Sequence, residues 1–433
     1  MKTAIQLLMV IALLAFPFGS DAQLLQKVKK KVTGQVEKKI EKGLEKKSTP
    51  AEPSSSDTEP VAEQGSGTET YTASSDPENR TSYKSKFDFV PGEQLILWED
   101  FNQDAIGDFP ALWFTNGSGE VVSVDGKEGK WLMLKENSSF FFDSFVALGE
   151  NYTIQFDLFC SVPFEWGSSP IQFFLRNVID LDRFRKGDNG SEASSWNINN
   201  TFSFKLHPGI VPPPNSYGTN GYGEYRVNGI HANNIDLKTI WLPSSEKHHI
   251  KVSIWGQKER LRIYVNENKI VDAPKILPKD MKPNLFEFQI SSMYEQDNYF
   301  IGNIRMAIGN PDTRNKLLTE GKLVTNSIMF SVNSDKIKPE SYGALKEISG
   351  IIKESKVNVM IIGHTDSDGD ESANMELSKK RAEAVKNALV SDFGVTGDML
   401  STEGRGESSP LESNSTSIGK AKNRRVEFVR IIN

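Results

Sequence analysis

The sequence has little cysteine and histidine, and each shortage excludes a class of site. Its 433 residues include one Cys and five His. A single thiol rules out a disulfide within the chain, and Cys160 shares one face of a predicted strand with Ile154, Phe156 and Leu158, which indicates a buried core thiol. The histidines have no zinc-like spacing, and neither an HExxH motif nor a serine nucleophile elbow occurs. These common hydrolase sites are therefore not predicted.

An excess of basic residues is also missing. Lys and Arg number 51 against 57 Asp and Glu, so the formal net charge is -6 and we expect no binding to nucleic acid. The length leaves room for more than one domain, because a single hydrophobic core stops growing at about 250–300 residues.

Long apolar runs are missing outside the N-terminus. In residues 1–22, Lys2 precedes an apolar run, and small residues follow before Gln23. The run is too short to span a membrane and polar sequence follows at once, which predicts a cleaved secretory signal peptide. No lipobox cysteine is present, so a lipoprotein is not expected.

Two segments of different composition come next. Residues 23–47 place Leu and Val on a narrow stripe among lysines, which predicts a basic amphipathic helix. Such a helix would bind an anionic membrane surface or a partner helix. The alternative is a helix that stays solvated and partly formed because of its glycines, and the sequence leaves both readings open.

Residues 48–84 are rich in Ser, Thr, Glu, Pro and Gly, which predicts a disordered linker.

Residues 85–310 contain short alternating apolar runs with no sustained helical period, which predicts an antiparallel β-sandwich. The expected strands are 98–101, 131–134, 140–142, 152–160, 171–175, 202–206, 249–255, 261–265, 286–290 and 300–308. The hairpin formed by 249–255 and 261–265, the start EDFNQDAIGDFPALW and the late strand ending at Ile308 resemble concanavalin-like and laminin-G-like jelly rolls.

That resemblance implies a glycan or protein ligand on the sandwich. Tyr217, Tyr222 and Tyr225 lie in a loop-rich stretch and would either stack on sugar rings or cover a sheet edge. A glycoside hydrolase is the alternative, and it requires two carboxylates held about 5–10 Å apart. The sequence does not pair the many Asp and Glu residues of this region.

Near the C-terminus, a strand-to-helix loop gathers opposite charges. Val359 and Ile361 alternate like a half-buried strand, and apolar residues after Asn374 recur at helical spacing. Asp366 lies in the loop between these elements and Arg381 about two turns into the helix, so the two side chains could face each other. One carboxylate and one guanidinium at a shared pocket would suit a zwitterionic ligand.

Five segments in order make this region similar to the OmpA-like peptidoglycan-binding domain, over residues 321–433. They are Ile328 to Phe330 with Ile337-Lys338-Pro339, Gly363 to Asp366 with Gly369, Asn374 with Leu377-Ser378 and Arg381-Ala382, Gly404 to Pro410, and Asn423 to Glu427. The resemblance implies an α/β fold with a small mixed sheet and packed helices.

The resemblance also implies a ligand, the diaminopimelate of the peptidoglycan stem. Asp366 matches the residue that contacts its ammonium, and Arg381 matches the one that contacts its carboxylate, a role that suits the planar donor fork of Arg. Thr365, Asn374 and Leu377 match positions near the pocket, with Asn374 expected to hold the loop by amide hydrogen bonds. The alternative is an intramolecular surface salt bridge between Asp366 and Arg381, worth about 0–1 kcal/mol.

The basic pair Arg424-Arg425 has two open readings, a direct ligand role for Arg424 or a solvated strand edge.

Asp366, Asp368 and Asp370 imitate the start of a calcium loop, but Glu371 replaces the required Gly. His364, a lone histidine at a strand end, fits a structural role better than a metal ligand. We therefore expect no metal and no cofactor.

Together these features predict a non-enzymatic periplasmic protein, associated with the outer membrane through a partner or the basic helix. It would anchor a β-sandwich to peptidoglycan without a covalent bond. The alternative is a wall-tethered glycoside hydrolase with its active site in the sandwich.

Overall fold

The computed structural model describes residues 87–431, except for 163, 166, 187–200, 210–220, 239, 243–247, 280 and 310–311. The predicted signal peptide, basic helix and linker lie outside these described residues. We call residues 87–309 the sheet module and residues 312–431 the C-terminal module. Both belong to one compact unit, Arg80–Asn433.

The larger sheet of the sheet module has eight antiparallel strands. Its order is β13 (Asn268–Ala273), β12 (Arg260–Val265), β11 (His249–Gln257), β6 (Asn151–Cys160), β15 (Tyr299–Ile308), β4 (Lys130–Leu134) and β3 (Gly119–Ser123), and β1 (Gln94–Glu99) pairs with β15. Strand β15 pairs with β4 near its start and with β1 near its end, so β1 lies at an edge of the sheet.

The second sheet has seven antiparallel strands. Its order is β10 (Ile230–Lys238), β9 (Gly221–Val227), β8 (Thr201–His207), β7 (Ile171–Arg176), β14 (Leu285–Ile290), β5 (Ser138–Phe142) and β2 (Trp113–Thr115). A short helix, α3 (Leu181–Arg185), follows β7.

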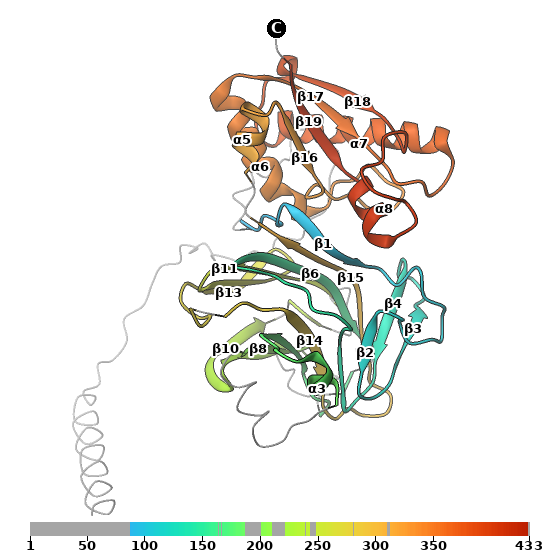
Figure 1. Ribbon diagram of the computed structural model, residues 1–433, viewed down its shortest axis with the longest axis vertical. Helices are drawn as coiled ribbons and strands as arrows, with labels where there is room; N and C mark the ends of the chain where they lie inside the picture. The colour runs from blue at the N-terminus through green and yellow to red at the C-terminus, as the bar shows by residue number, and fades with distance from the viewer. Residues whose placement is uncertain are drawn as a thin grey trace, which may run out of the picture. The chain divides into compact units, whose positions relative to one another are not determined.

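The two sheets bury one common apolar core between them (Figure 1). Phe156 of β6 contacts Phe173 of β7 and Phe288 of β14, with ring centroids 5.2 and 5.1 Å apart. Because strand side chains alternate between faces, these aromatic rings meet across the two sheets. The prediction of a mostly antiparallel, multi-sheet module is confirmed, while the jelly-roll connectivity stays a prediction.

One predicted strand is placed wrongly. We expect a strand at 98–101, but β1 covers Gln94–Glu99 and Phe101 lies beyond it with φ 56°. The side chain of Glu99 turns the chain there, because its carboxylate accepts a hydrogen bond from the Phe101 amide at 2.8 Å. Phe101 is nevertheless fully buried, which explains why its apolar character resembles that of a strand residue.

The C-terminal module is an α/β unit with a four-stranded sheet in the order β16 (Lys322–Thr325), β19 (Val426–Ile431), β17 (Asn358–Gly363) and β18 (Leu400–Gly404). Strands β17 and β18 are parallel and the other pairs antiparallel, so the predicted small mixed sheet is confirmed. Its helices are α5 (Thr313–Leu318), η3 (Pro339–Ser341), α6 (Tyr342–Ser355), α7 (Glu371–Ser391), η4 (Gly397–Met399) and α8 (Ser417–Asn423).

The resemblance implies that Ile328 to Phe330 form the opening strand of this module, and this expectation is wrong. The first strand of the module is β16, and Phe330 makes only an isolated bridge with Ile337. Ile328 is buried in the core of the module, so its apolar character reflects packing rather than strand pairing. None of the described helices is long and apolar enough to cross a membrane.

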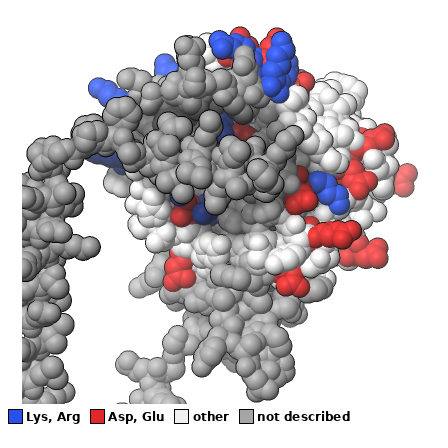
Figure 2. Space-filling view, turned by 90° about the horizontal axis from the view of Figure 1, so that it is seen from below, with Lys and Arg blue, Asp and Glu red and all other residues white. Residues whose placement is uncertain are grey.

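Acidic side chains gather along one side of the face shown in Figure 2, with uncharged areas between them. The described part of this face does not present the continuous basic surface with which proteins neutralise nucleic-acid phosphates.

A buried ionic network joins the two modules. Lys251 of β11 lies 3.3 Å from Asp157 of β6 and 2.9 Å from Glu340 of η3. Burial opposes the ionised form of both carboxyls, but their partners outweigh it and hold the pKa of Asp157 and of Glu340 below the ordinary range. Lys251 is the largest of these partners for both, and His249 and Asn303 also act on Asp157. The two carboxylates in turn raise the pKa of Lys251 despite its burial. The network therefore requires all three charges.

We predict that Lys251→Met lowers the free energy of unfolding of the full chain by about 3–5 kcal/mol at pH 7, because it leaves two carboxylates buried without a cation. Lys269→Met is the control, since Lys269 pairs with Asp88 at a more exposed position and its loss costs about 0–1 kcal/mol. Denaturation by urea measures both values.

The pH dependence has a definite sign. Carboxyls whose folded pKa is depressed stabilise the protein above their unfolded pKa of about 4 and lose this contribution as the pH falls through the folded pKa. The pKa of Lys251 is raised, so its contribution is complete only below the unfolded lysine pKa of about 10. The difference between the wild type and Lys251→Met should therefore be complete between about pH 5 and pH 10 and shrink in more acidic or more alkaline buffer. Equal stability of the two proteins at pH 7 would contradict the network.

Candidate functional site

The candidate site lies where β17 and α7 approach closely, and glycine makes this approach possible. A Cβ atom at Gly363 would collide with the Ser378 carbonyl oxygen, and one at Gly404 would meet the Lys379 backbone nitrogen. The Ser378 hydroxyl sits in this narrow gap and accepts a hydrogen bond from the Gly406 amide at 2.9 Å. The strand and the helix therefore hold the loop at residues 364–370 from both ends.

Asn374 fixes this loop from the first turn of α7. Its Nδ2 donates to the carbonyl oxygens of Asp366 and Asp368 at 3.3 and 3.0 Å and to the Glu407 carboxylate at 2.6 Å. Gly369, with φ 94°, lets the chain turn between Asp368 and the start of α7. Asn374 thus makes the amide hydrogen bonds that its position predicts, and Glu407 is a partner that the sequence did not indicate.

Asp366 pairs with Arg424 and not with Arg381. Nη1 of Arg424 donates to Oδ2 of Asp366, and the other carboxylate oxygen accepts the Asp368 amide at 3.2 Å. Asp366 is only 7% exposed, so its charge is largely removed from solvent. The intramolecular salt bridge between Asp366 and Arg381 is not the arrangement that forms.

Arg381 approaches from α7 with its guanidinium partly occupied. Its Nε donates to the Ser334 carbonyl oxygen at 3.0 Å, and the guanidinium lies 5.0 Å from the centre of the Phe330 ring. Among the described residues, neither Nη atom has a hydrogen-bond partner. Burial and the like charge of Arg424 lower the pKa of Arg381 to about 10, and it stays ionised at neutral pH. Its two Nη atoms are thus available for a carboxylate.

The adjacent residues Arg424 and Arg425 have different environments. Arg425 is buried, and it donates to Glu427 at 2.9 Å and to the Ser409 carbonyl oxygen at 2.9 Å. Arg424 faces Asp366, with its side chain 31% exposed. The reading of this pair as a solvated strand edge is therefore wrong, since one residue is structural and the other belongs to the site.

A buried cluster lies next to the site on β19. Glu427 contacts Arg425, Lys322 and His364, with His364 Nε2 at 3.5 Å from its carboxylate. Burial opposes ionisation of Glu427, but these cationic and histidine partners outweigh it and hold its pKa well below the ordinary range. His364 itself is 2% exposed, which agrees with a structural role.

The remaining predicted residues are Thr365 in the loop and Leu377 on α7. Thr365 is buried, its amide donates to the Gly406 carbonyl oxygen at 3.0 Å, and its hydroxyl has no partner within the described part of the chain. Leu377 is half-buried on α7. The structure thus brings Asp366, Arg381, Arg424, Thr365 and Asn374 around one loop.

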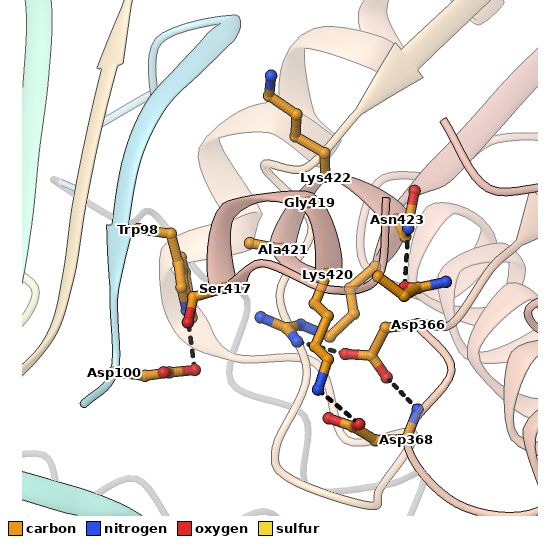
Figure 3. A network of polar contacts seen from close by, with 12 residues as sticks. Trp98, Asp100, Asp366, Asp368, Ser417, Gly419, Lys420, Ala421, Lys422 and Asn423 are labelled. Atoms are coloured by element: carbon orange, nitrogen blue, oxygen red, sulfur yellow. Dashed lines mark hydrogen bonds and ion pairs between the residues drawn. The ribbon is translucent and has the colours of Figure 1, made fainter. Parts of the chain in front are cut away.

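Helix α8 supplies contacts that sequence reasoning missed (Figure 3). Lys420 donates to Asp368 at 2.7 Å, and this hydrogen bond raises the pKa of the Lys420 ammonium. Asn326 caps the end of the helix by donating to the carbonyl oxygens of Ala421, Lys422 and Arg424. The one signal for this helix is Thr416, whose hydroxyl accepts the Gly419 amide at 3.1 Å as an N-cap.

The sheet module offers less support for a site. Tyr217 lies outside the described residues, Tyr222 is 37% exposed and Tyr225 is half-buried, and both described tyrosines belong to strand β9 rather than to a loop. Tyr222 stacks on the buried His207 ring with centroids 5.0 Å apart. This contact suits an aromatic residue that covers a sheet.

Its buried carboxylates have structural partners. Glu287 pairs with Arg176, Asp157 with Lys251, and Asp297 accepts the Ser168 hydroxyl at 2.6 Å. Glu99 accepts the Phe101 amide and the Trp113 indole. Each of these four carboxylates therefore has at least one structural partner within the sheet module.

Comparison with known proteins identifies the class of the C-terminal module. Residues 329–424 match the OmpA family. The chain therefore carries an OmpA family domain, and the predicted resemblance is confirmed for this part of the sequence.

Particular relatives share this region. The chain is 42% identical over 104 residues to the probable lipoprotein YiaD of Escherichia coli, covering 24% of this chain and 47% of the relative. It is 40% identical over 103 residues to the peptidoglycan-binding protein ArfA of Mycobacterium tuberculosis, covering 24% of this chain and 31% of the relative. The crystal structure of the peptidoglycan-associated lipoprotein from Burkholderia pseudomallei is 26% identical, with a TM-score of 0.24, covering 28% of this chain and 98% of that one.

The first curated relatives are matched over less than half of their own length. The family assignment consequently concerns the C-terminal module and leaves the sheet module unassigned.

We predict that Gly363→Ala destabilises the protein, because the added methyl group would collide with backbone at the contact between β17 and α7. Overpacking of this kind costs about 1–3 kcal/mol. Gly350→Ala on α6 is the matched control, since nothing lies within 4 Å of the place that its methyl group would take. There alanine should be neutral or stabilise by about 0.5–1 kcal/mol. Thermal unfolding of both variants measures the contrast, and equal effects would show that the close approach is not constrained.

Proposed function

We propose that the C-terminal module binds the peptide stem of peptidoglycan at diaminopimelate, and that the chain thereby holds its sheet module at the cell wall without a covalent bond. The observation that carries this proposal is the Asp366 carboxylate at a fixed loop, with the guanidinium groups of Arg381 and Arg424 nearby. An amino acid ligand carries an ammonium and a carboxylate, and this arrangement offers a partner to each.

The two open Nη atoms of Arg381 suit the ligand carboxylate. A guanidinium donates two parallel hydrogen bonds to a carboxylate, and such charge-assisted bonds are stronger than neutral ones. Stacking on Phe330 and the hydrogen bond to Ser334 hold the guanidinium plane before the ligand arrives. A preorganised donor loses less entropy when it binds.

Asp366 suits the ligand ammonium. Its two oxygens have about four lone-pair sites, and Arg424 and the Asp368 amide occupy two of them. The site therefore retains acceptor capacity for an ammonium. Thr365 and Leu377 would form the wall of the pocket beside it.

The relatives give independent support. One relative of this module is named a peptidoglycan-binding protein, at 40% identity over 103 residues. The similarity covers only a fraction of either chain, so the role of the whole protein is our proposal.

Location in the envelope follows from the same proposal. A domain that binds peptidoglycan acts in the periplasm, and the predicted signal peptide at residues 1–22 supplies a route of export. Association with the outer membrane would depend on a partner or on the basic segment 23–47. The sheet module would present a binding surface for a glycan or a protein in a non-catalytic role.

We predict that Asp366→Asn and Arg381→Met each weaken co-sedimentation of the full chain with purified peptidoglycan. Each change removes one partner of a desolvated charge contact, at a cost of about 2–5 kcal/mol, which corresponds to at least about thirtyfold in affinity. Titration of meso-diaminopimelate by calorimetry gives the same comparison with a small ligand.

Arg314→Met is the matched control for the loss of one positive charge. Arg314 makes an exposed ion pair with Glu354 on the same module, with both side chains more than half exposed. Binding should be unchanged in this variant. Full retention of binding in both Asp366→Asn and Arg381→Met would refute the proposed site, provided that all variants keep the wild-type circular dichroism spectrum.

A further inference from the structure

The sheet module reaches the candidate site through its first strand. Trp98 of β1 lies against the guanidinium of Arg424, which is 5.2 Å from the centre of the Trp98 ring system. The indole nitrogen donates to Asp100 at 3.1 Å, which fixes the ring plane (Figure 3). A second contact joins the same two modules, since Gln103 donates to Ser417 of α8 at 2.8 Å.

The Arg424 guanidinium therefore has two partners from different modules. One is the Asp366 carboxylate in the C-terminal module, and the other is the Trp98 ring in the sheet module. Its side chain is 31% exposed, so without the ring it would have room to swing into solvent. Arg stacks on aromatic faces because its planar, weakly hydrated cation is attracted by the ring quadrupole.

We propose that Trp98 is a positioning residue of the diaminopimelate site, and that this site is completed by the sheet module. Trp98 holds the Arg424 guanidinium beside Asp366, where it acts together with Arg381 as a second donor for the ligand carboxylate. The proposal rests on the function proposed above and adds to it a residue that precedes Arg424 by more than three hundred positions in the sequence.

The charge balance of the site favours this role. Arg381 and Arg424 are two positive charges near the Asp366 carboxylate. After burial, the repulsion from Arg424 contributes most to the lowered pKa of Arg381, and Asp366 and Asp335 oppose it. A ligand carboxylate relieves that repulsion when it binds between them. Because the two cations repel each other, something must oppose the departure of Arg424, and Trp98 and Asp366 are the groups that do so.

A double-mutant cycle on the full chain tests the proposal. We expect Trp98→Ala to weaken meso-diaminopimelate binding about threefold to tenfold, the range expected for loss of a partly exposed cation–π contact. Trp98→Phe keeps a ring face and should stay within about twofold of the wild type. In the Arg424→Ala background, Trp98→Ala should cause no further loss, because Trp98 acts through Arg424.

Trp255→Ala provides the matched control. Trp255 also stacks on an arginine, with the Arg262 guanidinium 4.4 Å from its ring, but neither residue contacts the candidate site. This variant should bind the ligand as the wild type does. Three outcomes would each overturn the proposal. The first is a loss of affinity from Trp255→Ala as large as that from Trp98→Ala, and the second is a loss from Trp98→Ala that is the same with and without Arg424. The third is no loss of affinity from Trp98→Ala.

A readout without ligand separates this proposal from the proposed function. The Nε–H signal of Arg424 in nuclear magnetic resonance spectra should show a ring-current shift in the wild type that disappears in Trp98→Ala and persists in Trp255→Ala. If the wild-type protein does not bind diaminopimelate, the proposed function fails, while this signal still decides whether Trp98 positions Arg424. An unchanged signal in Trp98→Ala would show that it does not.

Discussion

The ion pair between Asp366 and Arg424 connects the two segments that form the candidate site. Asp366 belongs to a loop fixed by Asn374, and Arg424 follows a helix whose end is capped by Asn326. The two residues are 58 positions apart in the sequence, and their pairing joins the strand-to-helix loop to the closing segment. Because Asp366 is almost fully buried, an uncompensated charge there would be costly, and the pair satisfies it.

Much of the fold follows from periodicity in the sequence. Long alternating strands such as β6, in which nine of ten residues are buried, and the strand-to-helix pattern of β17 and α7 are predicted correctly. Strands β9 and β10 are missed because most of their described side chains are at least partly exposed, so no apolar alternation marks them. β9 pairs with β8, and β10 pairs with β9, so their strand form depends on tertiary pairing that local propensity does not contain.

The candidate site is predictable only in part for the same reason. Asp366, Arg381 and Asn374 lie on one loop and one helix, so their proximity follows from the local pattern. The partner of Asp366 does not, because Arg424 reaches it across the sheet from a different segment. Arg424 and Arg425 are adjacent identical residues with opposite environments, and only the backbone at the end of α8 decides which of them faces the loop.

A buried contact and a more exposed contact join the two modules, and they have different consequences for ligand binding. The network of Asp157, Lys251 and Glu340 is buried, so its disruption leaves unpaired charge and opposes separation of the modules. The contact between Trp98 and Arg424 is more exposed and weaker, and it shares a residue with the candidate site. A ligand that changes the position of Arg424 therefore changes a contact with the sheet module, and by thermodynamic reciprocity an event that moves β1 changes the affinity of the site. The buried network of Asp157, Lys251 and Glu340 keeps the modules together. The contact between Trp98 and Arg424 would make the ligand affinity of the site depend on the sheet module.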